Sequence, residues 1–232
     1  MAFQPIVDVS AHKIWGYEAL VRGVAGQGAY EVLSKVTEQN RYAFDQACRV
    51  KAIELAGSRI GGTDAKLSIN FMPNAVYEPK ACIRATLEAA SRTQFDPKRL
   101  MFEFTENERI SDADHVSNIV REYRRMGFTT ALDDFGAGYA GLSLLARFQT
   151  DLIKLDMELL RGIEASQVKQ AIVRGLVGIA NELNITLLAE GIETEAELQA
   201  IKALGIRLFQ GYYFARPQVE TFQSMTEMAR AA

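Results

Sequence analysis

Acidic side chains occur inside, or directly after, short apolar segments along most of the chain. Six carboxylates have this placement: Glu18, Glu103, Asp133, Asp134, Asp156 and Glu190. Two further polar residues, Asn70 and Lys154, share it. A single carboxylate buried in an apolar strand costs free energy and can be an accident of packing. Six of them at predicted strands are better explained by one site on which the strands converge.

These side chains offer the ligands of a hard divalent cation. Every donor is an oxygen, and neither His nor Cys stands close to them, so the set favours Mg²⁺ or Mn²⁺ over Zn²⁺. The adjacent pair Asp133-Asp134 indicates that one residue bridges two ions while its neighbour binds the second. Two ions about 3.5–4 Å apart are a recurring arrangement in the hydrolysis of phosphate esters.

Lys154 is the one cationic member of the set, two residues before Asp156. Its ammonium suits a developing negative charge or the attacking water of such a reaction. The alternative interpretation is a salt bridge to Asp156 or to a neighbouring acid.

Apolar periodicity predicts two strands at the start of the chain and then an alternation of helices and strands. The strands are expected at residues 3–9, 14–21, 65–71, 99–105, 128–132, 152–155, 185–189 and 206–209. The helices are expected at residues 31–56, 79–92, 111–126, 141–148, 166–183 and 194–204, the first of them stopped by Gly57. Such alternation implies parallel pairing with helices outside. We therefore expect an α/β fold, a TIM-like (β/α)₈ barrel, with residues 1–232 as one domain.

Strand periodicity also predicts which side chains share a face. The pairs expected to point into the barrel are Asn70 with Ser68, Glu103 with Met101, Asp133 with Ala131, Lys154 with Leu152, and Glu190 with Leu188. The polar member stands near the C-terminal end of its strand in each pair. That end is where barrel enzymes place their chemistry.

The composition limits the possible partners. A net charge of −3 argues against binding a nucleic-acid polymer. No apolar run is long enough for a membrane span, and the first residues do not resemble a secretory signal. We therefore expect a cytoplasmic protein that does not insert into membranes.

A glycine-rich segment follows the two adjacent aspartates. Gly136 and Gly138 permit backbone shapes and close ligand approach that other residues resist. We interpret this segment as a mobile lid over the site. Glu106 is a candidate anchor for the lid, and the alternative is a solvated side chain that opens the next segment.

Taken together, these segments resemble an EAL domain, the family of cyclic-di-GMP phosphodiesterases, over essentially the whole chain. The matching blocks are Glu18-Ala19-Leu20, Ser68-Ile69-Asn70, Glu103-Phe104-Thr105-Glu106, Leu132-Asp133-Asp134-Phe135-Gly136, Ile153-Lys154-Leu155-Asp156 and Ala189-Glu190-Gly191-Ile192-Glu193. The resemblance implies a barrel whose first strand is antiparallel to the rest. It also implies hydrolysis of cyclic-di-GMP to the linear dinucleotide pGpG by two Mg²⁺ or Mn²⁺ ions, in a homodimer. A regulatory domain or partner would lie outside this chain.

The resemblance further implies a role for each site residue. The first ion would be held by Glu18, Asn70, Glu103 and Asp133, and the second by Asp133, Asp134 and Glu190, with Asp156 as a further contributor. Glu190 would be the general base, Lys154 would position the water, and Glu106 would hold the lid. Arg22 would contact a phosphate, while Gln4, Leu20 and Gln210 would line the nucleotide pocket.

The lid departs from the pattern of many relatives, which carry one Thr and two Ser at positions that are Ala137, Ala140 and Gly141 here. If these hydroxyls cap a helix, each lost one costs about 0.5–2 kcal/mol. We therefore expect lowered or differently regulated activity. Two alternatives remain open: an EAL-like receptor that binds cyclic-di-GMP without cleaving it, and a barrel enzyme for an unrelated phosphorylated metabolite.

Overall fold

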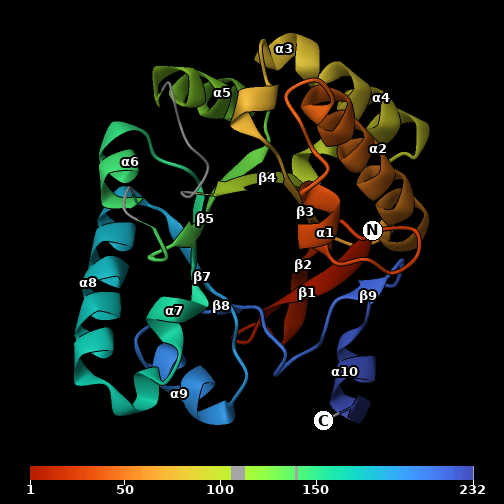
Figure 1. The fold of residues 1–232 in the computed structure, drawn as a ribbon. Coiled ribbons are helices and arrows are strands. Elements are labelled where there is room, and N and C mark those ends of the chain that lie inside the picture. Colours follow the sequence, from red (N-terminus) through yellow and green to blue (C-terminus); the bar gives the residue numbers. More distant parts are fainter. Residues whose placement is uncertain (106–112, 139–140, 232) are drawn as a thin grey trace.

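Eight strands close into a barrel in the computed structural model, which describes residues 1–105, 113–138 and 141–231. Neighbouring strands pair in the order β2-β3-β4-β5-β6-β7-β8-β1, and β1 pairs with β2 to complete the ring. All pairs from β2 to β8 are parallel, whereas β1 is antiparallel to both of its neighbours. The predicted barrel with an antiparallel first strand is therefore confirmed (Figure 1).

The strands are β1 (Ala2–Asp8), β2 (Lys13–Leu20), β3 (Lys66–Asn70), β4 (Leu100–Thr105), β5 (Thr129–Phe135), β6 (Leu152–Leu155), β7 (Thr186–Ala189), β8 (Leu208–Phe209) and β9 (Gln218–Val219). The α-helices are α1 (Ala29–Leu33), α2 (Arg41–Ile60), α3 (Pro79–Cys82), α4 (Arg84–Arg92), α5 (Ala113–Arg125), α6 (Gly141–Arg147), α7 (Met157–Leu160), α8 (Gln167–Leu183), α9 (Glu195–Ala203) and α10 (Met225–Ala231). Short 3₁₀ helices are η1 (Pro73–Ala75), η2 (Pro97–Arg99) and η3 (Ile163–Ala165). The short strand β9 pairs with β1 beside the ring.

The barrel interior is filled by a layer of six apolar side chains from six strands. They are Ile6, Met101, Ala131, Leu152, Leu188 and Leu208, all at most 1% exposed. Each lies two residues from a polar residue of the same strand parity, such as Met101 from Glu103. The apolar layer therefore forms a floor, and the polar residues lie above it at the C-terminal ends of the parallel strands.

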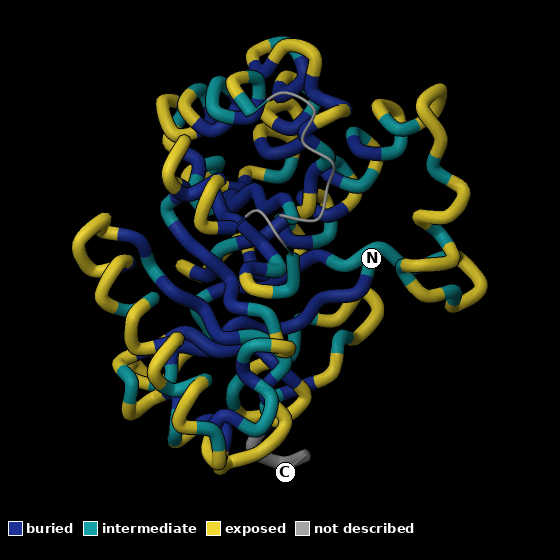
Figure 2. Tube along the Cα trace, turned by 60° about the vertical axis from the view of Figure 1, so that its left-hand side comes forward, coloured by how far each residue is buried: buried dark blue, intermediate teal, exposed yellow. Residues whose placement is uncertain are grey.

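Strand residues of the other parity pack against the surrounding helices. This larger core includes Phe71, Phe102 and Leu132, and the helices cover it from outside. Figure 2 shows the buried segments gathered in the interior of the molecule and the exposed ones around them, and the strands β1, β4 and β6 are buried almost throughout.

The predicted long helix at residues 31–56 was wrong at both ends. The chain forms the short helix α1, then a turn, and starts α2 only at Arg41. The turn is stabilised by Asn40, whose Oδ1 accepts a hydrogen bond from the Thr37 amide at 2.7 Å. Gly57 does not stop α2, which continues to Ile60. A side chain at Gly57 would collide with Thr93 after α4, so this glycine permits close packing instead.

Other element boundaries also differ. The helix expected at residues 79–92 is interrupted at Ile83, and the last barrel strand is reduced to two residues. Strand β5 runs three residues further than expected, to Phe135. Within the described parts of the chain, no helix combines the length and apolar character that a bilayer crossing requires.

Candidate metal centre

Five carboxylates meet above the apolar floor. They form two overlapping groups, Glu18 with Glu103 and Asp133, and Asp133 with Asp134 and Glu190, whose oxygens lie within 4.8 Å of one another in each group. These residues come from the ends of β2, β4, β5 and β7, which the barrel brings to one mouth. Asp133 belongs to both groups, as the sequence predicted for a residue that bridges two ions.

The backbone at Asp134 explains how two adjacent side chains serve one site. In a regular strand, neighbouring side chains point to opposite faces. Here the pairing of β5 with β6 is irregular between Leu132 and Phe135, and Asp134 has a positive φ of 55°. Asp tolerates this left-handed conformation better than most residues. The irregularity turns Asp134 back toward Asp133, whose Oδ1 accepts the Asp134 amide at 2.9 Å.

Lys154 provides the positive charge at the centre of the acidic groups. Its Nζ lies 2.8 Å from Glu190 Oε1 and 3.0 Å from Asp133 Oδ1, with Glu103 Oε2 at 3.3 Å and Glu18 Oε2 at 3.6 Å. The lysine side chain is 1% exposed. The alternative interpretation, that Lys154 forms salt bridges to neighbouring acids, is therefore true in part. Lys154 pairs with four acids, and all four belong to the candidate site.

Burial and crowding shift the acidity of these groups in different directions. Burial raises the pKa of Glu103 well above its ordinary value, and the nearby Glu18 and Asp133 charges add to this against the attraction of Lys154. Burial and Asp133 likewise raise the pKa of Glu190. Burial also opposes ionisation of Glu18, but Lys154 and the hydrogen bonds that Glu18 accepts outweigh it and lower its pKa. The single positive charge of Lys154 therefore does not compensate the negative charge that all five acids would carry when ionised.

The pKa of Lys154 shifts for the same reason. Burial disfavours the ammonium, but four surrounding carboxylates outweigh burial and raise its pKa well above the ordinary value. The surrounding carboxylates therefore favour the charged form of Lys154.

Asn70 and Ser68 orient the carboxylates from β3. Asn70 Nδ2 donates to Glu18 Oε1 at 3.1 Å and to Glu103 Oε1 at 3.0 Å, and Ser68 Oγ donates to Glu103 Oε2 at 2.5 Å. To act as a ligand through its oxygen, the Asn70 carboxamide must turn over. The sequence placed Ser68 on the inner face but gave it no role, although its strand parity with Asn70 was the available signal.

Gln4 and Gln210 lie directly beside Glu18. Gln210 Nε2 donates to Glu18 Oε2 at 2.6 Å and to Gln4 Oε1 at 3.1 Å, and Gln4 Nε2 donates to the Ala215 carbonyl at 3.1 Å. Both glutamines are buried. They fix the Glu18 carboxylate as well as lining the site.

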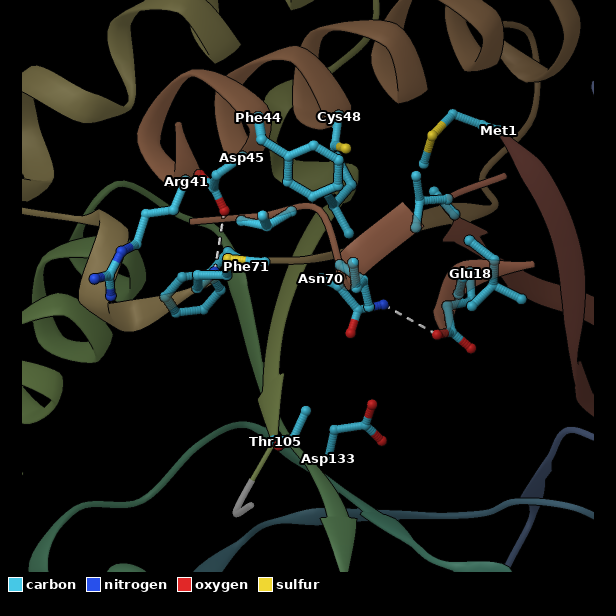
Figure 3. Close-up of a pocket in the computed structure, with 18 of the residues that line it drawn as sticks. Met1, Glu18, Arg41, Phe44, Asp45, Cys48, Asn70, Phe71, Thr105 and Asp133 are labelled. Atoms are coloured by element: carbon cyan, nitrogen blue, oxygen red, sulfur yellow. Dashed lines mark hydrogen bonds between the residues drawn. The ribbon is translucent and has the colours of Figure 1, made fainter. Parts of the chain in front are cut away.

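Two hollows open on either side of the acidic groups and share Glu18, Leu20, Asp133 and Asp134 in their walls. One, of about 370 Å³, is also lined by Lys154, Glu190, Gln210 and Tyr212. The other, of about 630 Å³, runs toward α2 and is lined by Phe44, Asp45, Phe71 and Met72 among others. Figure 3 shows Glu18, Asn70 and Asp133 facing the opening of this larger hollow.

Two predicted residues lie apart from the acidic groups, and a third is outside the described part of the chain. Asp156 lines the smaller hollow but belongs to neither acidic group, and its Oδ1 caps α7 by accepting the Glu158 amide at 2.7 Å. Arg22 follows β2 and donates to the carbonyl of its neighbour Val21 at 2.7 Å, outside the lining of both hollows. Glu106 lies outside the described residues.

The segment predicted to be a lid is described only in part. Gly136 has a φ of 100°, and the Ala137 amide donates to the Asp134 carbonyl at 3.1 Å, so a tight turn follows the candidate ligands. Gly141 begins α6 and is buried, while Ala140 lies outside the described residues.

The donor set fits two hard divalent ions. All candidate ligands are oxygens, one carboxylate is shared, and the buried acids hold more negative charge than Lys154 compensates. Such sites suit Mg²⁺ and Mn²⁺.

Solved structures with this fold include ligand complexes. A standalone versatile EAL protein from Vibrio cholerae O395, in its c-di-GMP bound form, is 54% identical with a TM-score of 0.92, and the match covers 99% of this chain and 96% of that one. BlrP1 of Klebsiella pneumoniae, in a manganese/cy-diGMP complex, is 37% identical with a TM-score of 0.88, over 94% of this chain and 56% of that one.

Curated relatives are longer proteins. The blue light- and temperature-regulated antirepressor BluF of Escherichia coli is 30% identical over 97% of this chain, and the cyclic di-GMP phosphodiesterase PA2567 of Pseudomonas aeruginosa is 28% identical over 94%. The chain spans 55% and 38% of the lengths of these two relatives. A comparison with models of known families matches residues 1–217 to the EAL domain. This match over nearly the whole chain confirms the resemblance seen in the sequence: the protein belongs to the EAL domain family.

Proposed function

We propose that this chain is a phosphodiesterase that hydrolyses cyclic-di-GMP to pGpG with two Mg²⁺ or Mn²⁺ ions, and so lowers the level of this second messenger in the cytoplasm. The observation that carries the proposal is the position of Asp133 in both acidic groups, which is the arrangement that two neighbouring ions need. A relative named as a cyclic di-GMP phosphodiesterase and a similar protein solved in its c-di-GMP bound form support the choice of substrate.

Each group of ligands would hold one ion. Glu18, Asn70, Glu103 and Asp133 would hold the first, and Asp133, Asp134 and Glu190 the second, with Asp156 reachable from the smaller hollow. When bound, the ions would neutralise the phosphodiester and lower the pKa of a coordinated water. Ser68 would orient Glu103 for the first ion, because its hydroxyl already donates to this carboxylate.

Glu190 and Lys154 are the residues proposed to handle the water. Glu190 is the most exposed of the four acids that contact Lys154, with a side chain 16% exposed, so water can reach its carboxylate. As general base it would take a proton from the water that attacks phosphorus. The bond between phosphorus and the 3′-oxygen would break, and this oxygen would take a proton from solvent to leave as a hydroxyl. Lys154 Nζ, 2.8 Å from Glu190 Oε1, would hold Glu190 and stabilise the charge that develops on the phosphate oxygens.

Each of the two hollows would receive one half of the cyclic dinucleotide. The phosphodiester would lie at the shared wall of Glu18, Leu20, Asp133 and Asp134, with one nucleoside arm extending to each side. Gln4, Leu20 and Gln210 line the smaller hollow in agreement with a role in substrate binding. For Arg22 to reach a phosphate, its side chain must leave the Val21 carbonyl.

A homodimer, a regulatory domain or partner, and an anchoring role of Glu106 remain part of the proposal, as does the single domain at residues 1–232. The second candidate function is a binding module. The name of the E. coli relative, an antirepressor, and the missing lid hydroxyls at Ala137, Ala140 and Gly141 favour it. The complete set of acidic ligands and Lys154 favour the enzyme.

Incubation of the purified chain with cyclic-di-GMP and Mg²⁺ or Mn²⁺, followed by chromatography, separates the two functions. The proposal predicts pGpG, which a chelator abolishes. Tight binding without product would establish the binding module instead.

A further inference from the structure

A buried ion pair lies behind the metal centre, outside the barrel wall. Arg49 NH2 lies 2.7 Å from Asp45 Oδ2, one turn earlier in α2, and the two side chains are 0% and 2% exposed. Arg49 NH1 donates to the Tyr123 hydroxyl of α5 at 3.0 Å. The pair belongs to neither acidic group, and Asp45 lies in the wall of the larger hollow.

Its contacts are the immediate chain neighbours of two proposed ligands. The Arg49 guanidinium carbon lies 5.5 Å from the ring centre of Phe71 and 5.3 Å from that of Phe102, which follow Asn70 and precede Glu103 in sequence. Strand alternation turns these rings outward while the ligands point inward. A cation within about 6 Å of a ring is attracted to its face. Arg49 therefore contacts the back of the same two strands that present the ligands.

Asp45 contacts the same turn through the backbone. Its Oδ1 accepts a hydrogen bond from the Met72 amide at 3.0 Å, which Figure 3 shows beside Phe71. The Phe71 amide in turn donates to the Glu103 carbonyl at 2.9 Å. The segment after Asn70 is thus held on one side by β4 and on the other by α2.

Stability alone is a weak reason for such a pair, because buried ion pairs are often replaceable by apolar residues without loss of stability. The pair makes two hydrogen bonds that apolar residues cannot make, from Arg49 to Tyr123 and from the Met72 amide to Asp45. Only the second reaches the segment that follows Asn70.

We infer that Asp45 and Arg49 are positioning residues of the metal centre. They fix the turn from Asn70 to Met72, and so fix where the Asn70 carboxamide meets Glu18 and Glu103. The inference rests on the proposed metal centre but not on hydrolysis. Residues that orient ligands in this indirect way commonly change metal affinity by about 10–100-fold when removed.

Two double variants isolate the Met72 hydrogen bond. Asp45→Asn with Arg49→Met removes both charges and keeps the acceptor, whereas Asp45→Leu with Arg49→Met removes the acceptor as well. Binding of Mn²⁺ alone is measured by the loss of the free Mn²⁺ spin-resonance signal, alongside thermal unfolding. We expect the Leu variant to bind Mn²⁺ about tenfold more weakly than the wild type. The Asn variant should stay near wild type.

A matched control removes an ion pair at the other end of the barrel. Asp8 Oδ2 lies 2.9 Å from Arg207 NH1, at the end of β1 away from Gln4. Asp8→Asn with Arg207→Met should leave Mn²⁺ affinity unchanged, whatever it does to the unfolding temperature.

Equal Mn²⁺ affinity in the two Asp45 variants would overturn the inference. A Leu variant that unfolds at a lower temperature but binds Mn²⁺ as tightly as the wild type would also overturn it. A wild type that binds no Mn²⁺ would overturn the metal centre together with it. Mn²⁺ binding without hydrolysis would contradict only the proposed activity.

A second measurement needs no variant. Because coupling between two sites is reciprocal, Mg²⁺ should slow hydrogen exchange of the Met72 amide. If Mg²⁺ binds but saturating Mg²⁺ leaves the exchange rate of this amide unchanged, the inference is overturned. This test holds even if the Leu variant fails to fold.

Discussion

Lys154 Nζ lies 2.8 Å from Oε1 of Glu190, the proposed general base. Among the described residues, Lys154 is the only cation in contact with the acidic groups. The same ammonium contacts Glu18, Glu103 and Asp133. Without metal ions, Lys154 is thus the main counter-charge of the site. Metal ions would share this task and leave Lys154 to hold Glu190 and the substrate.

Glu190→Gln should abolish turnover and preserve substrate binding. The amide keeps the size of the side chain but cannot accept a proton, and loss of a general base costs about 10²–10⁴-fold in rate. The turnover rate and the dissociation constant for cyclic-di-GMP are measured separately. Hydrolysis at the wild-type rate would remove Glu190 from the mechanism.

Lys154→Met should destabilise the metal-free protein by about 3 kcal/mol near neutral pH, because it leaves buried carboxylates without their partner. Added Mg²⁺ should restore much of this loss, and so should lower pH, since protons also neutralise the acids. Thermal unfolding with and without Mg²⁺ measures both effects.

The matched control for this variant is Lys66→Met. Lys66 is half-buried at the start of β3 and donates to Thr129 Oγ1 at 2.9 Å, away from the acidic groups. Any loss of stability that Lys66→Met causes should be the same with and without Mg²⁺. An equal response of the two variants to Mg²⁺ would contradict the role given to Lys154.

Metal affinity should weaken as the pH falls. The pKa values of Glu103 and Glu190 are raised in the metal-free protein, so both acids hold protons to a higher pH than usual. Metal ions must displace these protons, so affinity is constant above the raised pKa values and declines below them. Calorimetry in buffers of different ionisation enthalpy counts the protons released. Glu103→Gln should release fewer protons than the wild type when metal binds. Release of no protons by the wild type would refute the linkage between metal binding and proton release.

Asp134→Gly should separate stability from activity. Glycine adopts the φ of 55° without strain, so the free energy of unfolding should be unchanged or raised by up to about 1 kcal/mol. The second ion loses a ligand, so turnover should fall sharply. A variant of this kind that retained full turnover would show that Asp134 does not bind metal.

Sequence periodicity predicted most of the site because a closed barrel leaves little freedom. Once Met101, Ala131, Leu152 and Leu188 are assigned to the interior, the polar residues two positions later must meet at one end. Asp134 is the exception, since strand alternation alone would turn it outward. Its inward position depends on a left-handed backbone that no local pattern reveals.

Tertiary packing decided the other features that sequence could not predict. Gly57 has the signature of a helix end but permits the close packing of α2 against Thr93. Asp156 has the parity of a ligand, yet its carboxylate caps α7. Asp45 and Arg49 have the i, i+4 spacing of an ordinary helix-surface pair, and only the fold shows that Phe71, Phe102 and Tyr123 surround them.

The most direct test of the account counts bound Mn²⁺ ions per chain while the formation of pGpG from cyclic-di-GMP is followed. The account predicts that product appears only as the second ion binds, and that Asp133→Asn, which alters the ligand shared by both groups, loses both occupancy and product. Full turnover with one ion per chain, or in the presence of excess chelator, would contradict it.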